Sequence, residues 1–325
     1  MSPQAAPLLA CLADQAVYRL QEQGRFRCKS LGRRQTPFGP SEVIFLSEEA
    51  DTPYYLLPQH GVGGYQLSGS FINYRANLYA LKDLGVQGII SFSAAAAISH
   101  NHNVGDLILV SDLIDRTTHR PGTFFENAGF GALRQFPVFC PALRKAMADC
   151  LRDMGCQFRD DSTLVVTEGP RLETPAEVRS LAAAGGELVG HHLAPEAFLA
   201  KELELCLAGV AFVTNYAETG SQYRPFSASD LFGGLASPDN EERVDHALRV
   251  IAALAPKVAT YAARHGRTCE CDKTMRATAA KYGLPEDWHE WFPPVPAGDA
   301  GVYEQTPTGP ASRMGHIGRA RLEKP

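Results

Sequence analysis

The chain has 325 residues, of which 45% are hydrophobic and 21% charged, and its formal net charge is −5 at pH 7. These fractions are typical of a folded globular protein, which excludes a chain that is disordered or collagen-like throughout. Acidic and basic residues are interspersed, so there is no basic stripe to favour nucleic acid as a partner. No apolar run approaches the length of a membrane span. The N-terminal stretch lacks a basic region ahead of its apolar residues, so we expect no secretory signal and a cytoplasmic protein.

Short apolar segments alternate along the chain with segments of helical periodicity. The short segments predict buried strands over 42–46, 87–93, 106–111, 163–167 and 207–214. The periodic segments predict helices over 72–84, 141–154, 175–184, 195–205 and 241–264. Thr174, Pro175 and Glu177 form a capping-box pattern, which predicts that the third helix begins at Pro175. The alternation predicts an α/β fold with a mixed, largely parallel central sheet and helices on both faces, and such sheets bind ligands at strand ends.

Composition divides the chain into three parts. We expect a divergent N-terminal segment over 1–35, a main domain over 36–265, and a tail or arm over 266–325. The last part contains both tryptophans, two proline-rich turns and a basic end, with little periodicity. It is predicted to pack on the surface or on a neighbouring subunit, and a lid over the site is the alternative.

Eight cysteines occur in the chain, at 11, 28, 140, 150, 156, 206, 269 and 271. Most fall inside apolar or helical patterns and are predicted to be small buried residues in a reducing compartment. Only Cys269 and Cys271 are close together, with His289 further along the chain. Their C-x-C spacing differs from the paired C-x2-C spacing of structural zinc sites, so no metal site is predicted.

Polar residues follow several of the predicted strands. FVTNYAETG places Asn215 just past one strand, EGPRLETPAEV places Glu173 after another, and ELVGHHLAPEAF contains a further strand-to-helix junction. The chain also contains TPFGPSE from 36, QHG from 59, NYRANLYALKDLGV from 73 and DLIDRTTHRPGTFF from 112. With these motifs in this order, the chain resembles the trimeric purine nucleoside phosphorylases, including the methylthioadenosine and methylthioinosine phosphorylases.

The resemblance implies the nucleoside phosphorylase fold and cleavage of a purine nucleoside with phosphate as co-substrate and without a cofactor. The products would be the purine base and ribose 1-phosphate, and 5′-modified nucleosides such as methylthioinosine belong to the same substrate class. It also implies a homotrimer in which the stretch containing His119, Phe124 and Phe125 contributes to a neighbour's site.

For the base, the resemblance implies contacts from Asn215, Glu173 and Leu172. Asn215 would accept from the proton on N7 and donate to the oxygen at C6, and Glu173 would accept from N1–H, which favours a 6-oxopurine. Asn215 is also a predicted catalytic residue, because negative charge develops on the departing base. Relatives that cleave adenine nucleosides carry a carboxylic acid in place of Asn215 and another in place of Ala217. Leu172 stands where an aromatic ring usually stacks on the base.

For the sugar, the resemblance implies His191 and Glu196; for the acceptor it implies Gln59, His60, Ser93, Ala94 and His192, with His60 also catalytic. The acceptor residues depart from the family pattern. Residues 1–35 contain no glycine-rich phosphate turn, Gln59 replaces an arginine, and His192 replaces a threonine. A missing arginine removes a bidentate clamp on phosphate.

Three functions therefore remain open from the sequence. The first is a purine nucleoside phosphorylase. The second is a nucleosidase, or another nucleoside-modifying enzyme, that uses water or a different acceptor. The third is a non-catalytic homologue that binds a nucleoside, and the presence of Glu173, Asn215, Glu196 and His60 together argues against it. The segment around Tyr223–Pro225, expected to cover the 5′ end of the substrate, has no readable pattern.

Overall fold

A computed structural model describes residues 8–14, 20, 24, 27–47, 52–62, 66–126, 128–218 and 238–294. The segment around Tyr223–Pro225 and the end of the tail lie outside these ranges. The strands are β1 (Leu9–Ala13), β2 (Cys28–Gly32), β3 (Gln35–Thr36), β4 (Gly39–Pro40), β5 (Ile44–Ser47), β6 (Tyr55–Pro58), β7 (Gly88–Ala97), β8 (Leu107–Leu109), β9 (Asp112–Arg116), β10 (Thr163–Thr167), β11 (Leu188–Gly190) and β12 (Cys206–Tyr216). The α-helices are α2 (Tyr74–Asp83), α3 (Pro141–Asp153), α4 (Pro175–Ala183), α5 (Glu196–Glu202), α6 (Pro238–His265) and α7 (Arg276–Tyr282).

The predicted elements are confirmed. The five predicted strands correspond to β5, β7, β8, β10 and β12, and the five predicted helices to α2 through α6. The capping box at the start of α4 is present in both directions, between Thr174 and Glu177. Strands β1, β2, β6, β9 and β11 were not among those predicted.

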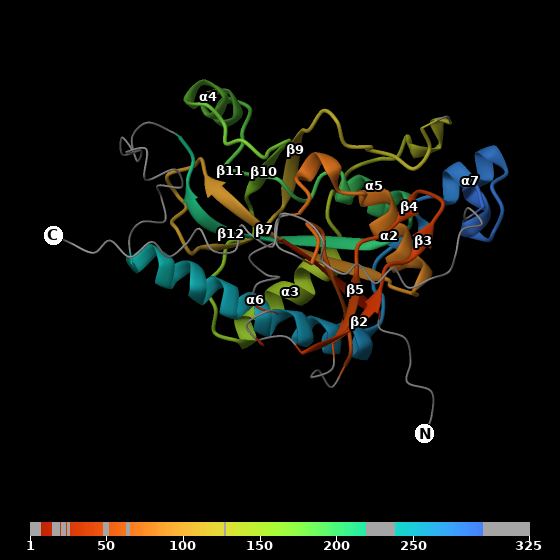
Figure 1. Ribbon diagram of the computed structural model, residues 1–325, viewed down its shortest axis with the longest axis horizontal. Coiled ribbons are helices and arrows are strands. Elements are labelled where there is room, and N and C mark those ends of the chain that lie inside the picture. The colour runs from red at the N-terminus through yellow and green to blue at the C-terminus, as the bar shows by residue number, and fades with distance from the viewer. Residues whose placement is uncertain are drawn as a thin grey trace.

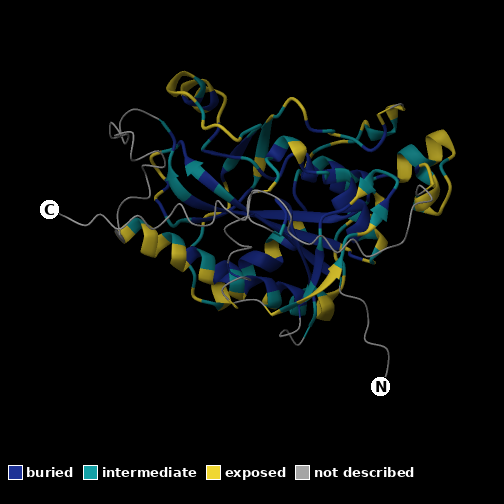
Figure 2. Ribbon diagram, viewed as in Figure 1, coloured by how far each residue is buried: buried dark blue, intermediate teal, exposed yellow. Residues whose placement is uncertain are grey.

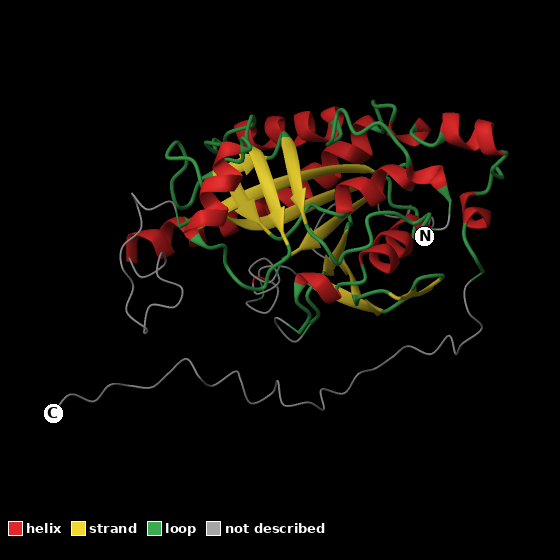
Figure 3. Ribbon diagram, turned by 90° about the horizontal axis from the view of Figure 1, so that it is seen from above, coloured by secondary structure: helices red, strands yellow, loops and turns green. Residues whose placement is uncertain are grey.

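Ten strands form one mixed, largely parallel sheet with helices on both faces, as predicted (Figures 1 and 3). Its order is β2-β5-β6-β1-β7-β11-β10-β9, while β12 pairs with β7 and β8. Because β1 lies between β6 and β7, the sheet begins well before residue 36. The segment over 1–35 thus contributes a central strand to the main domain.

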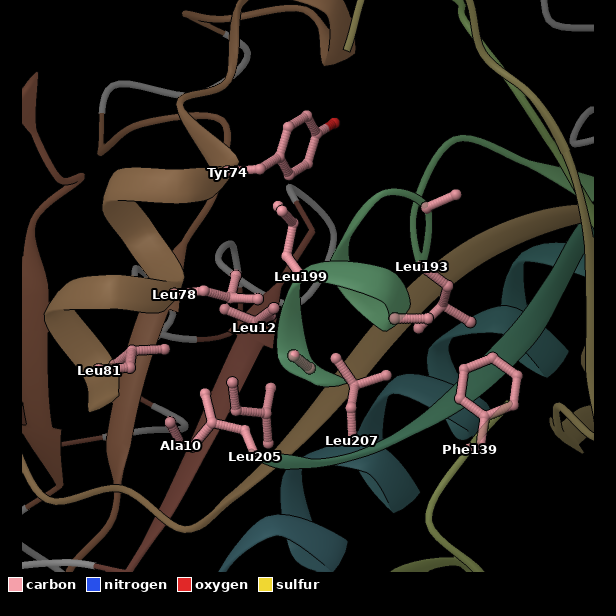
Figure 4. Packing of buried hydrophobic residues seen from close by; sticks show 14 of the residues in the cluster. Ala10, Leu12, Tyr74, Leu78, Leu81, Phe139, Leu193, Leu199, Leu205 and Leu207 are labelled. Carbon is pink, nitrogen blue, oxygen red and sulfur yellow. The ribbon is translucent and has the colours of Figure 1, made fainter. Parts of the chain in front are cut away.

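Side chains that alternate along the strands fill two large cores, one on each face of the sheet, and a smaller third cluster includes residues of α4. Along β1, Ala10 and Leu12 enter the core that also holds residues of α2 and α5, whereas Leu9 and Cys11 enter the core that holds residues of α3 and α6. Figure 4 shows the first core, with side chains of α2 facing those from the α5 region. The central strands β1, β6 and β7 are largely buried, and α4 and α7 at the periphery are largely exposed (Figure 2).

Strand β7 has different partners along its two edges. One edge pairs with β12 along the whole length of β7. The other edge pairs with β1 up to Ser91, and then with β11 from Ala95 onward. Strands β1 and β11 run in opposite directions here, so their carboxyl ends face each other across Ser93 and Ala94. A Cβ on Gly190, at the end of β11, would lie 3.0 Å from the Ala94 carbonyl oxygen, so the close approach favours glycine.

The described part of the C-terminal segment packs on the same chain. Phe292 stacks on Phe125, with ring centroids 5.4 Å apart, and also contacts Phe124. Phe124 and Phe125 are therefore buried in this chain's own core, whereas the His119 side chain is 77% exposed.

The cysteines are arranged differently from the prediction. Cys140, Cys206, Cys269 and Cys271, which the sequence pattern left scattered, are gathered in one place. His289 is not among them, because its ring binds Asp287 and Asp83 instead. Among the described helices, none combines the length and apolar character that crossing a bilayer requires.

Candidate functional site

Two of the residues predicted to bind the acceptor lie at the gap between the ends of β1 and β11. Ser93 and Ala94 lie on β7 at the gap, and the Ser93 side chain is fully buried. The Ala94 amide, predicted to bind phosphate, donates instead to Asp14 Oδ2 at 2.8 Å. Asp14 directly follows β1 and is buried. The Asp14 carboxylate thus accepts a hydrogen bond from an amide that was predicted to bind phosphate.

A chain of hydrogen bonds connects the other predicted acceptor residues with Glu196. His60 Nδ1 lies 2.6 Å from the Leu67 carbonyl oxygen, and its Nε2 lies 3.1 Å from His192 Nε2. Gln59 Nε2 lies 3.4 Å from His192 Nδ1 and donates to Glu196 Oε1 at 3.2 Å.

One set of tautomers satisfies every contact in this chain. His60 donates from Nδ1 to Leu67, so its Nε2 accepts from His192, whose Nδ1 in turn accepts from Gln59. Gln59 and His192, two departures from the family pattern, therefore contact each other.

Burial keeps the two histidines of this cluster, His60 and His192, uncharged. Desolvation lowers the pKa of His60, and lowers that of His192 well below 6.5, so both rings are neutral at pH 7. Desolvation also raises the pKa of Glu196. Within the described chain, Gln59 Oε1 and Glu196 Oε2 are buried without a hydrogen-bond partner. Leaving such atoms unpaired is costly, so these two oxygens are suited to accept from a polar ligand.

A second cluster forms where β10 ends. Thr167 Oγ1 donates to Glu173 Oε1 at 2.6 Å and lies 3.2 Å from His191 Nδ1, which donates to it. Burial lowers the pKa of His191, and the nearby Glu173 carboxylate partly opposes this effect. Glu173 and Thr167 line a pocket of about 350 Å³, large enough for part of a small ligand. Thr167 was not predicted as a site residue.

Of the other residues predicted to bind the base, Asn215 lies near the end of a strand and Leu172 lies on the surface. Asn215 lies at an irregularity near the end of β12, opposite Ala96 of β7. Its Oδ1 accepts from Thr214 Oγ1 at 2.8 Å, and its Nδ2 donates to the Tyr216 carbonyl at 3.2 Å. Ala217 is buried just beyond. Leu172 is 51% exposed on the surface.

Arg120 connects the segments that follow β10 and β11, and it was not among the predicted site residues. Its fully buried guanidinium donates to the carbonyls of His191 and Ala194, each at 2.7 Å, and to those of Thr167 and Glu168. Its Nε donates to the Glu168 carboxylate at 3.2 Å. Arg120 lies within the DLIDRTTHRPGTFF motif, but its carbonyl partners are distant in sequence, so no local pattern identifies them.

Glu168 is the anion that balances Arg120. Burial alone would raise its pKa, but hydrogen bonds from the Thr118 and His119 amides, the Ser70 hydroxyl and Arg120 lower the pKa to about 2. The carboxylate therefore stays ionised and fixes the loop after β9 against the end of β10.

The fold agrees with comparisons to known proteins. The family model described as the phosphorylase superfamily matches residues 26–256. The chain belongs to the phosphorylase superfamily.

Among relatives in this superfamily, a 6-oxopurine nucleoside phosphorylase of Pyrococcus furiosus is 39% identical over 56% of this chain and 71% of its own length. A probable S-methyl-5′-thioinosine phosphorylase of Methanopyrus kandleri is 34% identical over 75% of this chain and 91% of its own length. A methylthioadenosine phosphorylase from an antarctic soil metagenomic library has a solved structure that aligns with a TM-score of 0.70 at 25% identity, covering 83% of this chain and 91% of that one.

The ion pair beneath the site yields a stability prediction. We expect Glu168→Gln to lower the free energy of unfolding at pH 7 by about 2–4 kcal/mol, because the native pKa lies well below the usual value of 4.5. A depressed native pKa gives stability that is complete above the unfolded pKa and is lost as pH falls toward the native one. The difference between parent and variant should therefore shrink from about pH 5 toward pH 2.

Urea unfolding at several pH values measures this difference. The matched control is Glu177→Gln, because Glu177 also has a pKa of about 2 but is exposed and pairs with Arg171 at the surface. We expect a much smaller loss for the control. Equal losses for the two variants would contradict the role assigned to Glu168.

Proposed function

We propose that the chain cleaves the N-glycosidic bond of a 6-oxopurine nucleoside and transfers the ribosyl group to phosphate, releasing the purine base and ribose 1-phosphate. The substrate class includes 5′-modified nucleosides such as methylthioinosine. Superfamily membership and relatives named as 6-oxopurine nucleoside and methylthioinosine phosphorylases support the reaction. The observation that carries the choice of base is the presence of Glu173 and Asn215 at strand ends of this fold.

The two residues suit the hydrogen-bonding pattern of a 6-oxopurine. Glu173 is already oriented by Thr167, and its other carboxylate oxygen can accept from N1–H of the base. The Asn215 amide can exchange its local bonds to Thr214 and Tyr216 for the atoms N7 and O6. Stabilising the base as it departs lowers the barrier to an oxocarbenium-like transition state.

The buried oxygen of Glu196 supports the predicted sugar site, and that of Gln59, a residue predicted to bind the acceptor, can serve the same sugar. Both atoms accept hydrogen bonds, and ribose hydroxyls are donors of matching chemistry. In our proposal, Glu196 Oε2 accepts from the ribose, while Oε1 stays bound to Gln59. His191 borders the same sugar from the end of β11.

The acceptor region is the least favourable part of the site for an anion. His60 and His192 are neutral at pH 7, so neither supplies the positive charge of the missing arginine. Phosphate must also displace the Asp14 carboxylate from the Ala94 amide. We therefore propose that phosphate binds weakly, with Ser93 and Ala94 as its contacts on β7.

The Asp14 contact also favours a second function, hydrolysis of the same bond. A carboxylate held in the acceptor region can take a proton from water as the water attacks the sugar carbon. The residues that bind base and sugar would be unchanged, and the product would be free ribose instead of ribose 1-phosphate.

Product analysis separates these two reactions. Inosine, guanosine and methylthioinosine should each yield a pentose 1-phosphate in the presence of phosphate, at rates that rise up to unusually high phosphate concentrations. Free pentose formed at a rate independent of phosphate would contradict phosphorolysis and support hydrolysis.

The same assay tests the Asp14 contact directly. We expect Asp14→Ser to lower the KM for phosphate by about tenfold or more, because one charge-assisted hydrogen bond contributes roughly 1.5–3 kcal/mol. The control is Asp153→Ser at the exposed end of α3, which should leave this KM unchanged. Saturation of the parent at low-millimolar phosphate or below would show that the acceptor region binds phosphate well despite Asp14.

Base choice provides a further prediction. Because a site built on specific hydrogen bonds rejects a base that leaves them unpaired, kcat/KM for inosine should exceed that for adenosine by roughly 10³-fold or more. Asn215→Asp should shift this ratio toward adenosine, while Asn101→Asp on an exposed loop should not. Equal or better turnover of adenosine by the parent would refute the assignment of Glu173 and Asn215.

We also propose that the chain forms a homotrimer, as the resemblance implies. The exposed His119 is the residue we expect to extend toward a neighbour's site, whereas Phe124 and Phe125 are used within the chain. Light scattering at micromolar concentration should give the mass of three chains, and the mass of one chain would refute the proposal.

A further inference from the structure

Four cysteine sulfur atoms converge at the end of the molecule where β12 begins. The Sγ atoms of Cys140, Cys206, Cys269 and Cys271 all lie within 4.8 Å of one another. The Sγ atoms of Cys206 and Cys269 are 3.3 Å apart. Sulfur atoms that surround a zinc ion tetrahedrally at about 2.3 Å lie about 3.8 Å apart, within this range. We propose that these four residues form a tetrathiolate site for one zinc ion.

The four ligands come from segments that are far apart in the sequence. Cys140 is the residue before α3, Cys206 is the first residue of β12, and Cys269 and Cys271 follow α6. The backbone places the first two together, because the Cys140 amide donates to the carbonyl of Leu207 at 2.8 Å. The fold thus supplies two ligands, and the C-x-C motif supplies two more. Because this spacing differs from the paired C-x2-C motifs of structural zinc sites, the sequence did not predict the site.

The surroundings suit a group of thiolates. The Leu143 amide, in the first turn of α3, donates to Cys140 Sγ at 3.4 Å, as amides do around metal-bound thiolates. The positive end of the α3 dipole points toward the same sulfur. Lys201 lines the same cavity as Cys140, Cys269 and Cys271. The α3 dipole and the charge of Lys201 partly offset the net charge of −2 that four thiolates and one Zn²⁺ carry.

A metal site requires all four sulfur atoms to be close to one another, a condition that two disulfides do not impose. Two disulfides require only two close pairs of sulfur atoms, whereas a metal requires all four to be close to one another, as they are here. All eight cysteines of the chain are free thiols in the structure. Binding is then simple exchange, in which four thiols release four protons as four Zn–S bonds form, with no oxidant needed. A tetrahedral set of four sulfur ligands suits zinc.

The site would fix the C-terminal segment to the sheet. Around it, the Thr274 hydroxyl donates to the Lys201 carbonyl, the Met275 amide donates to Glu204, and the Met275 side chain is fully buried. Cys206 begins β12 and Asn215 lies near its other end, so the site is structural and separate from the nucleoside site. Its test is therefore independent of the proposed function.

The experiment measures metal content on the full chain, purified without chelator or added metal after expression in zinc-supplied medium. Elemental analysis and native mass spectrometry should find about one zinc per chain in the parent. Cys271→Ser removes a ligand in the partly exposed segment, and Cys140→Ser removes one in the core. Each should lower the zinc content at least about fivefold. Cys156→Ser, outside the cluster, is the matched control and should keep the full content.

A second measurement does not depend on any variant folding. Removing zinc from the parent with a strong chelator should expose the segment after α6 to limited proteolysis, and restoring zinc should protect it again. Cobalt(II) added to the zinc-free protein should give the absorption bands of a tetrahedral thiolate site. The proposal is overturned if the parent carries little zinc, carries iron instead, or shows disulfides among these four cysteines by mass spectrometry of unreduced peptides.

Discussion

One edge of strand β7 pairs with two different strands, whose carboxyl ends face each other. The candidate site depends on this arrangement. Strand β1 occupies the first half of the edge and β11 the second half. Where they end, the backbone of Ser93 and Ala94 has no neighbouring strand on that side; Asp14 enters the gap, and Gly190 closely approaches both residues. Buried backbone groups require partners, so a gap of this kind is closed by polar side chains or by a ligand. It concentrates hydrogen-bonding groups at the centre of an apolar sheet.

The electrostatics of the site follow from how those groups are buried. Arg120 is fully used by carbonyl oxygens and by Glu168, so its charge holds the strand ends in place and is not offered to a ligand. The histidines beside it are neutral because of burial and because of one another. The result is a site rich in acceptors, with Glu173, Gln59 and Glu196, in which the buried histidines carry no positive charge. Such a site suits the N–H and O–H donors of a nucleoside better than it suits an inorganic anion.

Much of the fold could be predicted from the sequence, because hydrophobic periodicity and the capping box at Thr174 are local signals. Strand β1 was not predicted, although LLACLA is a short apolar run. It lies within residues 1–35, which were treated as a divergent segment because they contain no glycine-rich phosphate turn. The predicted site residues around Glu196 do come together, but their interactions could not be predicted. The contacts of Gln59 with His192 and of Asp14 with Ala94 join residues more than 75 positions apart, and no spacing rule predicts them. The cysteine cluster was missed for the same reason.

The most direct measurement is a crystal structure of the protein with hypoxanthine and a high concentration of phosphate. It tests whether the base binds at Glu173 and Asn215 while Asp14 restricts the acceptor region at the strand-end gap. We predict that N1–H of the base binds Glu173, that N7 and O6 face Asn215, and that the Asp14 carboxylate remains on the Ala94 amide unless phosphate is near saturation. A base bound without contact to Glu173 or Asn215 would contradict this account of the site.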